Sequence, residues 1–255
     1  MAKNYNADSI TVLEGLEAVR RRPGMYIGSI GSRGLNHLIY EILDNSVDEH
    51  LAGYGTEIDV TLGKDGSCTI RDKGRGIPVD RHKKGISAER IVMTTLHAGG
   101  KFDDSNYKTS GGLHGVGSSV VNALSNYMRV RVFQDGKIYE DEYSRGIPTK
   151  ELVDGLLPVV GKTRETGTET CFIPDDTIFE KTRFKEDWLK SRLHETAYLN
   201  PNLHLFFRDE RGVEPVEIEY YEPNGIVSFV EELVKDSDKA VTPVIYFKGK
   251  SEKTE

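Results

Sequence analysis

The sequence contains very little cysteine and no long apolar run. Two cysteines, Cys68 and Cys171, occur in 255 residues, and they form neither a CxxC pair nor a metal-ligand spacing. This pattern excludes a disulfide-stabilised scaffold and favours free thiols in a reducing compartment. The N-terminal stretch MAKNYNADSI has no apolar signal core, and no segment is long enough to cross a membrane. We therefore expect a cytoplasmic protein that makes no membrane contact.

Basic residues are outnumbered by acidic ones. The chain has 34 Lys and Arg against 41 Asp and Glu, which gives a formal net charge of -7. A chain with this balance lacks the basic field with which a whole domain grips nucleic acid, so any DNA contact must be local or lie elsewhere in a larger protein. The hydrophobic fraction of 37% is ample for a core. The length suits one large domain, or one domain plus the start of another.

The periodicity of the apolar residues alternates between that of strands and that of helices. Helical spacing predicts two helices whose N-terminal caps are Ser9 and Ser87. Further helices are predicted in 34–53, 119–125, 184–200 and 226–236. Alternation of apolar and polar residues around short turns predicts hairpins in 56–74, 127–144 and 203–222. The same alternation predicts single strands in 167–175 and 243–250. Strands in hairpins and helices in separate blocks indicate an α+β two-layer sandwich rather than a strictly alternating βαβ fold.

One stretch nearly matches a phosphate-binding P-loop. Residues 155–163 read GLLPVVGKT, but five residues rather than four separate Gly155 from Gly161, and Pro158 stiffens the loop. No strong strand precedes this stretch and no helix follows Thr163. A chance surface loop is therefore the preferred interpretation.

Two further glycine-containing stretches leave a choice between a site and a plain turn. Residues 111–119, GGLHGVGSS, open a helix whose backbone N–H groups and dipole favour an anion, although a flexible hinge would look the same. Residues 71–78, RDKGRGIP, follow a strand, so that Asp72 could accept a hydrogen bond from the amino group of a base. Taken alone, each of these stretches is a weak signal.

The stretch EILDNSVDE, residues 41–49, lies in a helix with an unusual polar stripe. The apolar residues that follow the helical period are Leu35, Leu38, Ile39, Ile42, Leu43 and Val47. The other side carries His37, Glu41, Asn45, Asp48 and Glu49. A solvated acidic face is the simplest interpretation of such a stripe. The alternative is a site in which a glutamate activates water and an amide oxygen binds Mg²⁺, which completes its shell with phosphates and waters.

Together, these stretches resemble a known family. The strings EILDNSVDE, DKGRGIP, LHAGGKF, GGLHGVGSSVVNALS and TGT, with AVRRRPGMYIGS near the start, have the order and spacing of the N-terminal ATPase region of bacterial type IIA DNA topoisomerase B subunits. Such regions occur in the B subunits of DNA gyrase and of topoisomerase IV, and they belong to the GHKL superfamily. The resemblance implies the Bergerat (GHKL) ATPase fold, a mixed, mostly antiparallel sheet covered by helices, with ATP and Mg²⁺ as cofactors.

The resemblance also implies catalytic and metal-binding roles on the polar stripe. Glu41 matches the general base that activates water for attack on the γ-phosphate, and His37 matches a residue that supports this base. Asn45 matches the amide that holds Mg²⁺ between the phosphates.

Other positions match residues that bind the nucleotide. Asp72 matches the carboxylate that binds the adenine amino group, helped by Thr168 through water, and Glu49 matches the partner of Arg75. The remaining matched positions line the adenine pocket, wrap the triphosphate, or form an arm that reaches into a second protomer: Gly76, Ile77, Pro78, Lys101, Gly112, Leu113, His114, Gly115, Val116 and Gly117, and in the arm Tyr5 and Ile10.

The resemblance further implies domains and partners. Residues 1–222 are expected to form the ATPase domain, with 1–15 as a dimerisation arm, and 223–255 to begin a transducer domain that supplies a further lysine beyond this sequence. We therefore expect weak turnover and weak dimerisation from these 255 residues alone. The expected partners are a second copy of the B-type chain in a homodimer, an A-type DNA-cleaving subunit, DNA through the full-length enzyme, and aminocoumarin inhibitors. Gln134 and Asp135 stand where gyrases often carry an arginine, which predicts weaker aminocoumarin binding.

Other functions remain open at this point. A nucleotide-gated clamp without catalysis would share the fold, but Glu41 favours an enzyme, because such a module has no need of a base. A sensor-kinase ATP domain is disfavoured by the RRPGMYIGS segment and by the arm that contains Tyr5. The sequence does not separate gyrase from topoisomerase IV.

Overall fold

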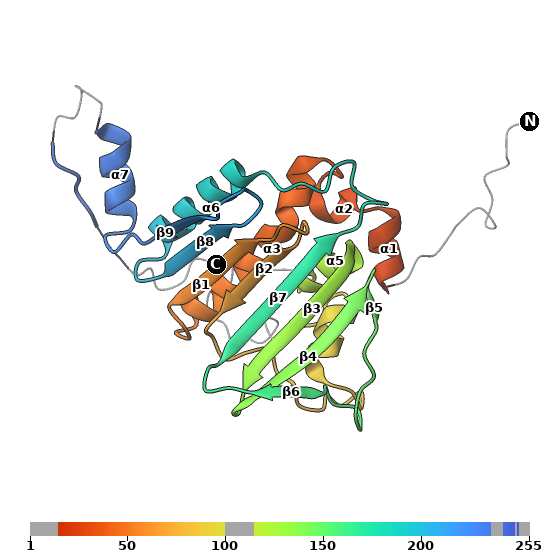
Figure 1. Ribbon diagram of the computed structural model, residues 1–255. Helices are drawn as coiled ribbons and strands as arrows, with labels where there is room; N and C mark the ends of the chain where they lie inside the picture. The colour runs from red at the N-terminus through yellow and green to blue at the C-terminus, as the bar shows by residue number, and fades with distance from the viewer. Residues whose placement is uncertain (1–14, 100–114, 236–241, 248, 250–255) are drawn as a thin grey trace, which may run out of the picture.

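A mixed sheet of nine strands organises the part of the chain that the computed structural model describes, residues 15–99, 115–235, 242–247 and 249. The strand order is β5-β4-β3-β7-β2-β1-β8-β9, and β6 pairs with β4 (Figure 1). Of the described pairings, β1 with β8 is parallel and the others are antiparallel. The strands are β1 Glu57–Leu62, β2 Cys68–Asp72, β3 Ser125–Gln134, β4 Lys137–Ser144, β5 Ile147–Pro148, β6 Val159–Lys162, β7 Gly167–Pro174, β8 His204–Asp209 and β9 Val216–Tyr220.

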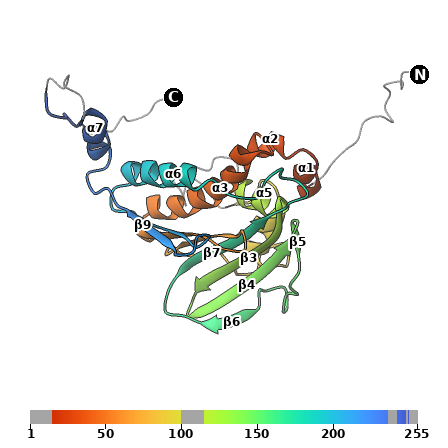
Figure 2. The same ribbon diagram turned by 45° about the horizontal axis from the view of Figure 1, so that its top comes forward.

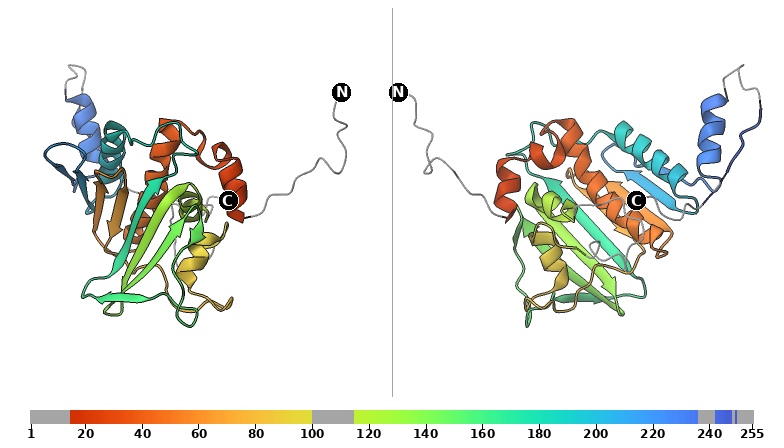
Figure 3. Two further views of the ribbon diagram at one scale, coloured as in Figure 1. Left: turned by 45° about the vertical axis from the view of Figure 1, so that its right-hand side comes forward. Right: turned by 180° about the vertical axis from the view of Figure 1, so that it is seen from behind.

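Helices cover one face of this sheet and form the second layer (Figures 2 and 3). They are α1 Gly15–Arg21, α2 Gly24–Ile27, α3 Ser32–Leu51, α4 Ala88–Thr94, α5 Gly117–Ala123, α6 Glu186–Leu199 and α7 Ile226–Val234. The predicted two-layer α+β sandwich is therefore confirmed. The predicted hairpins are confirmed too, because β1–β2, β3–β4 and β8–β9 each pair antiparallel along the chain.

The alternation along each strand decides which face the helices cover. In β1, Ile58, Val60 and Leu62 are buried and alternate with half-buried residues. The buried side chains pack against the apolar side of α3, where Leu35, Leu38, Ile39, Ile42 and Leu43 are at most 4% exposed. Burial of each such side chain stabilises the fold by about 1.5–3 kcal/mol. This shared core fixes the height of α3 above the sheet, and with it the position of the polar stripe.

The opposite face of the sheet carries charges that pair across strands. The strand register places Arg131 opposite Glu140 on one side and Glu169 on the other. Glu169 in turn lies opposite Arg71, and Arg71 lies opposite Asp59. Arg131 Nε donates to Glu140 Oε2 at 2.6 Å, and Arg131 Nη1 lies 3.7 Å from Glu169 Oε1. Charges therefore alternate in sign from β4 to β1, so that each lies opposite its complement, and such cross-strand pairs stabilise one register of the sheet.

Three predictions about local structure are wrong. Ser87 occupies the N-cap position of α4 but makes no side-chain cap, and its hydroxyl points to the Val79 carbonyl, to which it donates at 3.1 Å. Asp48 is only 1% exposed, because the buried side of α3 extends beyond its apolar stripe to polar residues. Residues 243–247 form no strand, since no described strand lies beside them to share hydrogen bonds.

The rejected P-loop stretch is a surface strand. Residues 159–162 form β6 on the edge of β4, and Val159 and Val160 are about half exposed. The chain then runs without a helix from 163 into β7. No helix N-terminus therefore exists there to bind a phosphate, and the preference for a surface segment is confirmed.

The predicted helix after residue 225 is α7, which stands beside the main sheet (Figure 1). Its apolar residues Phe229, Val230 and Leu233 are 38–66% exposed. The contacts that join α7 to the rest run through Tyr198 of α6, whose ring lies 5.2 Å from that of Phe229. This helix therefore adds little to the core that holds the polar stripe.

Candidate active site

The polar stripe of α3 faces the beginning of α5. The two helices pack against each other, and the closest approach brings the backbone of Gly117 against the side chain of Glu41. A Cβ on residue 117 would lie 2.2 Å from Glu41 Oε2, so that a larger residue there would displace the end of the Glu41 side chain. Glu41 therefore lies where the glycine-rich stretch enters a helix, as the roles implied by the family resemblance require.

His37 and Glu41 form a pair one helical turn apart. His37 Nε2 lies 3.0 Å from Glu41 Oε1, and the two side chains are 39% and 31% exposed. The hydrogen bond with the Glu41 carboxylate raises the pKa of His37 above its ordinary value of 6.5, although burial opposes the rise. The imidazole therefore fixes the carboxylate, while solvent still reaches it. An oriented and solvent-accessible carboxylate can take a proton from water.

Asn45 lies one turn further along α3, against the same end of α5. Its Nδ2 donates to Ser118 Oγ at 3.1 Å. An amide oxygen and a hydroxyl suit Mg²⁺, which prefers hard oxygen ligands. Among the described residues, no three His, Cys, Asp or Glu side chains come together to hold a metal ion. A Mg²⁺ ion at Asn45 would therefore draw most of its ligands from phosphate and water, as Mg²⁺ commonly does.

Asp72 is a buried carboxyl at the end of β2. Its Oδ1 accepts hydrogen bonds from the backbone N–H groups of Gly74 at 2.9 Å and Thr168 at 3.2 Å, and its Oδ2 accepts one from Ser46 Oγ at 3.2 Å. Burial raises the pKa of Asp72 to about 6, although the backbone donors lower it. The Thr168 hydroxyl accepts a hydrogen bond from Ile77 N at 3.1 Å. Asp72 and Thr168 are thus fixed together below the α3 helix.

Glu49 and Arg75 form the predicted ion pair. Arg75 Nε and Nη2 donate to the two oxygens of Glu49 at 3.0 and 2.9 Å, and Arg75 N also donates to Glu49 Oε2 at 3.0 Å. The guanidinium lies over the Tyr54 ring, 4.1 Å from its centroid. A bidentate pair with a stacked guanidinium is rigid. It neutralises one end of the stripe and fixes the turn after β2.

Gly76, in the turn after β2, and Gly167, at the start of β7, allow neighbouring segments to approach closely. Gly76 has φ +83, and a Cβ there would lie 2.9 Å from Val132 Cγ1. Gly167 has φ +127, and a Cβ there would lie 2.0 Å from the Asp72 carbonyl oxygen. Ile77 is half-buried and Pro78 exposed. Both glycines are therefore required by the backbone, which favours a shaped turn over a chance one.

The predicted site residues in the described part of the chain form one continuous region. It runs from Asp72 and Thr168, past Glu49 and Arg75, to Asn45 and Glu41, and it ends at α5. The loop residues Gly115 and Val116 lie immediately before α5, and Gly115 has φ +60. The other predicted positions lie outside the described residues: Tyr5, Ile10, Lys101, Gly112, Leu113 and His114.

Sequence reasoning missed three members of this region. Ser46, Tyr54 and Ser118 each contact a predicted residue, namely Asp72, Arg75 and Asn45. Ser46 follows Asn45 directly, and Ser118 lies in a recognised glycine-rich stretch, so both had a positional signal. Tyr54 lies just past the end of α3, where only the fold shows that it meets Arg75.

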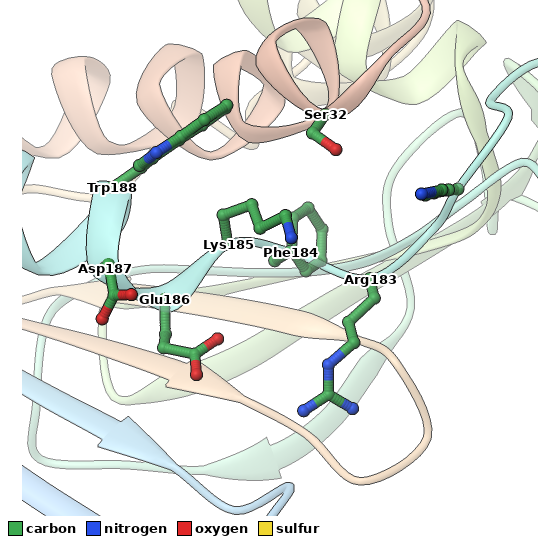
Figure 4. Close-up of a pocket in the computed structure, with 8 residues that line it drawn as sticks. Ser32, Arg183, Phe184, Lys185, Glu186, Asp187 and Trp188 are labelled. Atoms are coloured by element: carbon green, nitrogen blue, oxygen red, sulfur yellow. The ribbon is translucent and has the colours of Figure 1, made fainter.

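A pocket elsewhere on the surface uses none of these residues (Figure 4). It lies between the start of α3 and the segment that leads into α6. Its lining mixes basic, acidic and aromatic side chains: Ser32, Lys181, Arg183, Phe184, Lys185, Glu186, Asp187 and Trp188. Its lining holds three basic and two acidic side chains, so charges of both signs meet there.

Comparison with known proteins supports the same interpretation. Residues 31–175 match the family described as histidine kinase-, DNA gyrase B-, and HSP90-like ATPase. The chain is 51% identical over 249 residues to the B subunit of DNA topoisomerase 4 from Enterococcus faecalis, a match that covers 97% of this chain and 36% of that protein. It is 49% identical over 249 residues to the B subunit of DNA topoisomerase 4 from Streptococcus pneumoniae, covering 96% of this chain and 37% of that protein.

A solved structure has the same arrangement of strands and helices. The 43K ATPase domain of Thermus thermophilus gyrase B, in complex with an aminocoumarin, superposes with a TM-score of 0.77 at 42% identity. The match covers 89% of this chain and 57% of that one. The chain thus spans just over a third of the length of the curated relatives it matches. No helix among the described residues is long and apolar enough to cross a membrane.

Proposed function

This chain belongs to the histidine kinase-, DNA gyrase B-, and HSP90-like ATPase family, and we propose that it binds ATP with Mg²⁺ and hydrolyses it at the α3–α5 site. The observation that carries the proposal is the Glu41 carboxylate, held by His37 at 3.0 Å and packed against the start of α5. The fold is the GHKL ATPase fold of the gyrase B domain that it matches, and membership of an ATPase family implies nucleotide binding.

We assign the chain's residues to three tasks. Glu41 accepts a proton from water that attacks the γ-phosphate, and His37 is a positioning residue that orients Glu41. Asn45 holds Mg²⁺, which neutralises phosphate charge when bound. Asp72, supported by Thr168, accepts the adenine amino hydrogen bond, and the Glu49–Arg75 pair shapes the pocket with Gly76, Ile77 and Pro78. Phosphoryl transfer needs little beyond positioning, charge neutralisation and an oriented water, and these residues supply each of them.

In the whole protein, we propose that this domain is the ATP-driven gate of a type II DNA topoisomerase. Nucleotide binding would close a clamp made of two copies of the chain and drive strand passage, together with a DNA-cleaving A-type subunit in the cytoplasm. The names of the curated relatives support this proposal. We place the ATPase domain at 1–222, with 1–15 as the dimerisation arm, and the start of a transducer domain at 223–255. The exposed apolar side of α7 fits a helix that a further domain covers.

We also propose that aminocoumarins bind here, as one does to the gyrase B relative, but more weakly than to relatives with an arginine in the β3–β4 turn. Asp135 and Gly136 form that turn with φ 52 and φ 76, and Gln134 precedes them. Gln134 Oε1 is buried and has no hydrogen-bond partner among the described residues. An arginine would add a charged donor there, so Gln134→Arg should tighten aminocoumarin binding. Equal aminocoumarin affinities of the wild type and Gln134→Arg would contradict the proposal that Gln134 weakens binding.

The proposed nucleotide site is tested by calorimetric titration of this 255-residue chain with a non-hydrolysable ATP analogue, with and without Mg²⁺. Binding that Mg²⁺ strengthens supports the site. The same titration of Asp72→Ala provides the matched control, because this change removes the base contact and leaves the phosphate end intact. Equal binding by both proteins, or no binding by either, would overturn the assignment of the pocket.

A further inference from the structure

A second group of ionisable side chains lies buried between α4 and β4, away from the nucleotide site. Tyr143 Oη lies 3.0 and 2.9 Å from the two carboxyl oxygens of Glu89 and 2.7 Å from Asp141 Oδ2. Glu89, Asp141 and Tyr143 are all fully buried. Arg90 closes the group, because its Nε and Nη2 donate to both oxygens of Asp141 at 2.8 and 2.7 Å. Two carboxyl groups therefore meet at one phenol, and a guanidinium pairs with only one of them, Asp141.

The number of hydrogens in this group fixes the protonation of Glu89. A bidentate guanidinium holds Asp141 as a carboxylate. The phenol has a single hydrogen to donate, and its shortest contact is to Asp141. Its oxygen would then face the lone pairs of an ionised Glu89 in a buried place, an arrangement that costs free energy. A proton on Glu89 removes this conflict, because the carboxylic acid can donate to the phenol oxygen.

The electrostatic surroundings agree with the hydrogen count. The titratable and charged groups that face Glu89 are Asp141 and Tyr143 from β4 and Arg90 from its own helix. Burial raises the pKa of Glu89 well above its ordinary range, and the Asp141 charge raises it further. Arg90 opposes this rise, but its charge is already engaged by Asp141.

Two contacts hold α4 in place, and the second of them leads to the nucleotide site. Arg90 Nη2 also donates to the Lys150 carbonyl at 2.7 Å, which ties the start of α4 to the segment after β5. At the other end of α4, Asn122 Nδ2 of α5 donates to the Met93 carbonyl at 2.9 Å in a buried place. The opposite end of α5 contains Gly117 and Ser118, which contact Glu41 and Asn45. α4 therefore supports the helix that positions the catalytic end of the site.

We propose that Glu89 is a neutral carboxylic acid that attaches α4 to β4, and that it is a positioning residue for α5 whose ionisation in alkaline solution weakens nucleotide binding. The second half of this proposal rests on the nucleotide site proposed above, whereas the first half does not. Loss of the Glu89 proton would place two carboxylates side by side with one guanidinium. Repulsion would then separate α4 from β4, and α5 would lose its support at Met93.

The first test is infrared spectroscopy, which detects the C=O stretch of a protonated carboxyl group directly. The wild-type chain near neutral pH should show such a band, and Glu89→Gln should lack it. Glu89→Gln retains the shape and a hydrogen-bond donor but does not titrate. Tyr143→Phe provides a second variant, which keeps Glu89 but removes its acceptor and should shift the band. A band that is absent from the wild type, or unchanged in both variants, would overturn the proposal.

Stability against pH gives a second measurement that needs no nucleotide. Because the pKa of Glu89 is higher in the folded than in the unfolded state, the unfolding equilibrium constant of the wild type should rise about tenfold per pH unit above the unfolded pKa, until Glu89 ionises in the folded state. Glu89→Gln lacks this contribution, so the ratio of the two constants isolates it from other groups. A ratio that stays constant with pH would contradict a protonated Glu89.

Titration with the non-hydrolysable ATP analogue then tests the link to the site. As the pH is raised from neutral into the alkaline range, the dissociation constant of the wild type should rise several-fold more than that of Glu89→Gln, because only the wild type can lose a proton at position 89. If the dissociation constants of the wild type and Glu89→Gln change in parallel with pH while the infrared band of Glu89 is present, the role in positioning α5 is refuted. Absence of binding by either protein at any pH would instead contradict the nucleotide site, and the infrared band would still decide the state of Glu89.

Discussion

The α-carbon of Gly117 lies so close to the Glu41 carboxylate that a methyl group on it would come within 2.2 Å of Glu41 Oε2. This contact joins the two sequence features that together suggested a nucleotide site, namely the acidic helix and the glycine-rich stretch. Gly117 does not have a positive φ, so a substitution there acts through space rather than through backbone strain. A substitution at Gly117 therefore displaces the Glu41 carboxylate without changing residue 41 itself.

Gly117→Ala should retain the fold and lose most ATP hydrolysis. The methyl group displaces the flexible end of Glu41 from His37, and loss of a positioned base typically lowers the rate of hydrolysis by about 10²–10⁴-fold. Steady-state hydrolysis and the midpoint of thermal unfolding should be measured together. Gly24→Ala is the matched control, since a Cβ there meets nothing within 4 Å. Normal hydrolysis by Gly117→Ala would show that the position of Glu41 does not matter.

Glu41→Ala should still bind ATP but should not hydrolyse it. Glu41 is proposed to act on the attacking water and not on the nucleotide, so its removal affects the chemical step and spares binding. The dissociation constant for ATP and the rate of phosphate release test both parts. Asn45→Ala should differ by weakening both Mg²⁺-dependent binding and hydrolysis. Detectable turnover by Glu41→Ala would contradict the assignment of Glu41.

Nucleotide binding should weaken as the pH falls below about 6. Asp72 accepts the base amino hydrogen bond as a carboxylate, and its pKa is raised to about 6, so each pH unit below this value should lower the affinity by up to about tenfold. The effect on stability has the opposite direction, because this carboxyl stabilises the folded state most in acid and loses that contribution as the pH rises from 3.8 to about 6. Calorimetric titrations with the analogue at several pH values test the first effect. Asp72→Asn should bind weakly at every pH, and an affinity of the wild type that stays constant through this range would contradict the role.

The sequence was sufficient to predict most of the helices and strands, because these depend on local patterns, whereas the roles of the site residues were expected from the family resemblance. The alternation around Val130 and Val132 predicts β3, and the helical spacing from Leu35 to Val47 predicts the buried side of α3. The Glu49–Arg75 pair was predicted through the family resemblance, and the structure has it.

Other features depend on contacts between distant segments and could not be predicted locally. The parallel pairing of Ile58 with Leu205, and the place of β7 between β3 and β2, follow from how the whole sheet assembles. Asp48 has the composition of a surface residue and is nevertheless buried, since burial depends on what packs against α3 and not on its own polarity. The sequence suggests that the hydroxyl of Ser87 accepts a capping hydrogen bond, but in the fold it points to the Val79 carbonyl of a preceding segment and donates to it.

Asp175→Asn should destabilise the fold through a single buried carboxylate. Asp175 Oδ2 accepts hydrogen bonds from Arg20 of α1 at 2.7 Å and from Arg145 at 2.9 Å, while its Oδ1 accepts them from the backbone and the hydroxyl of Thr177. Burial alone would raise its pKa, but the donors from Thr177 and Arg20 prevail and lower it to about 2. One carboxylate thus joins α1, the turn after β4 and the end of β7.

The expected loss of stability is about 2 kcal/mol at neutral pH, since each unit of pKa shift corresponds to about 1.4 kcal/mol. Because the folded-state pKa lies below the ordinary value of 3.8, this contribution is present above that pH and disappears as the pH falls toward about 2. Urea unfolding at neutral pH and near pH 3 should therefore show a larger difference between wild type and Asp175→Asn at neutral pH. Asp176→Asn is the matched control, because that neighbouring side chain is exposed. If both variants lose the same stability, or if the Asp175 difference does not shrink in acid, then the arginines join these elements by packing and not by their charge.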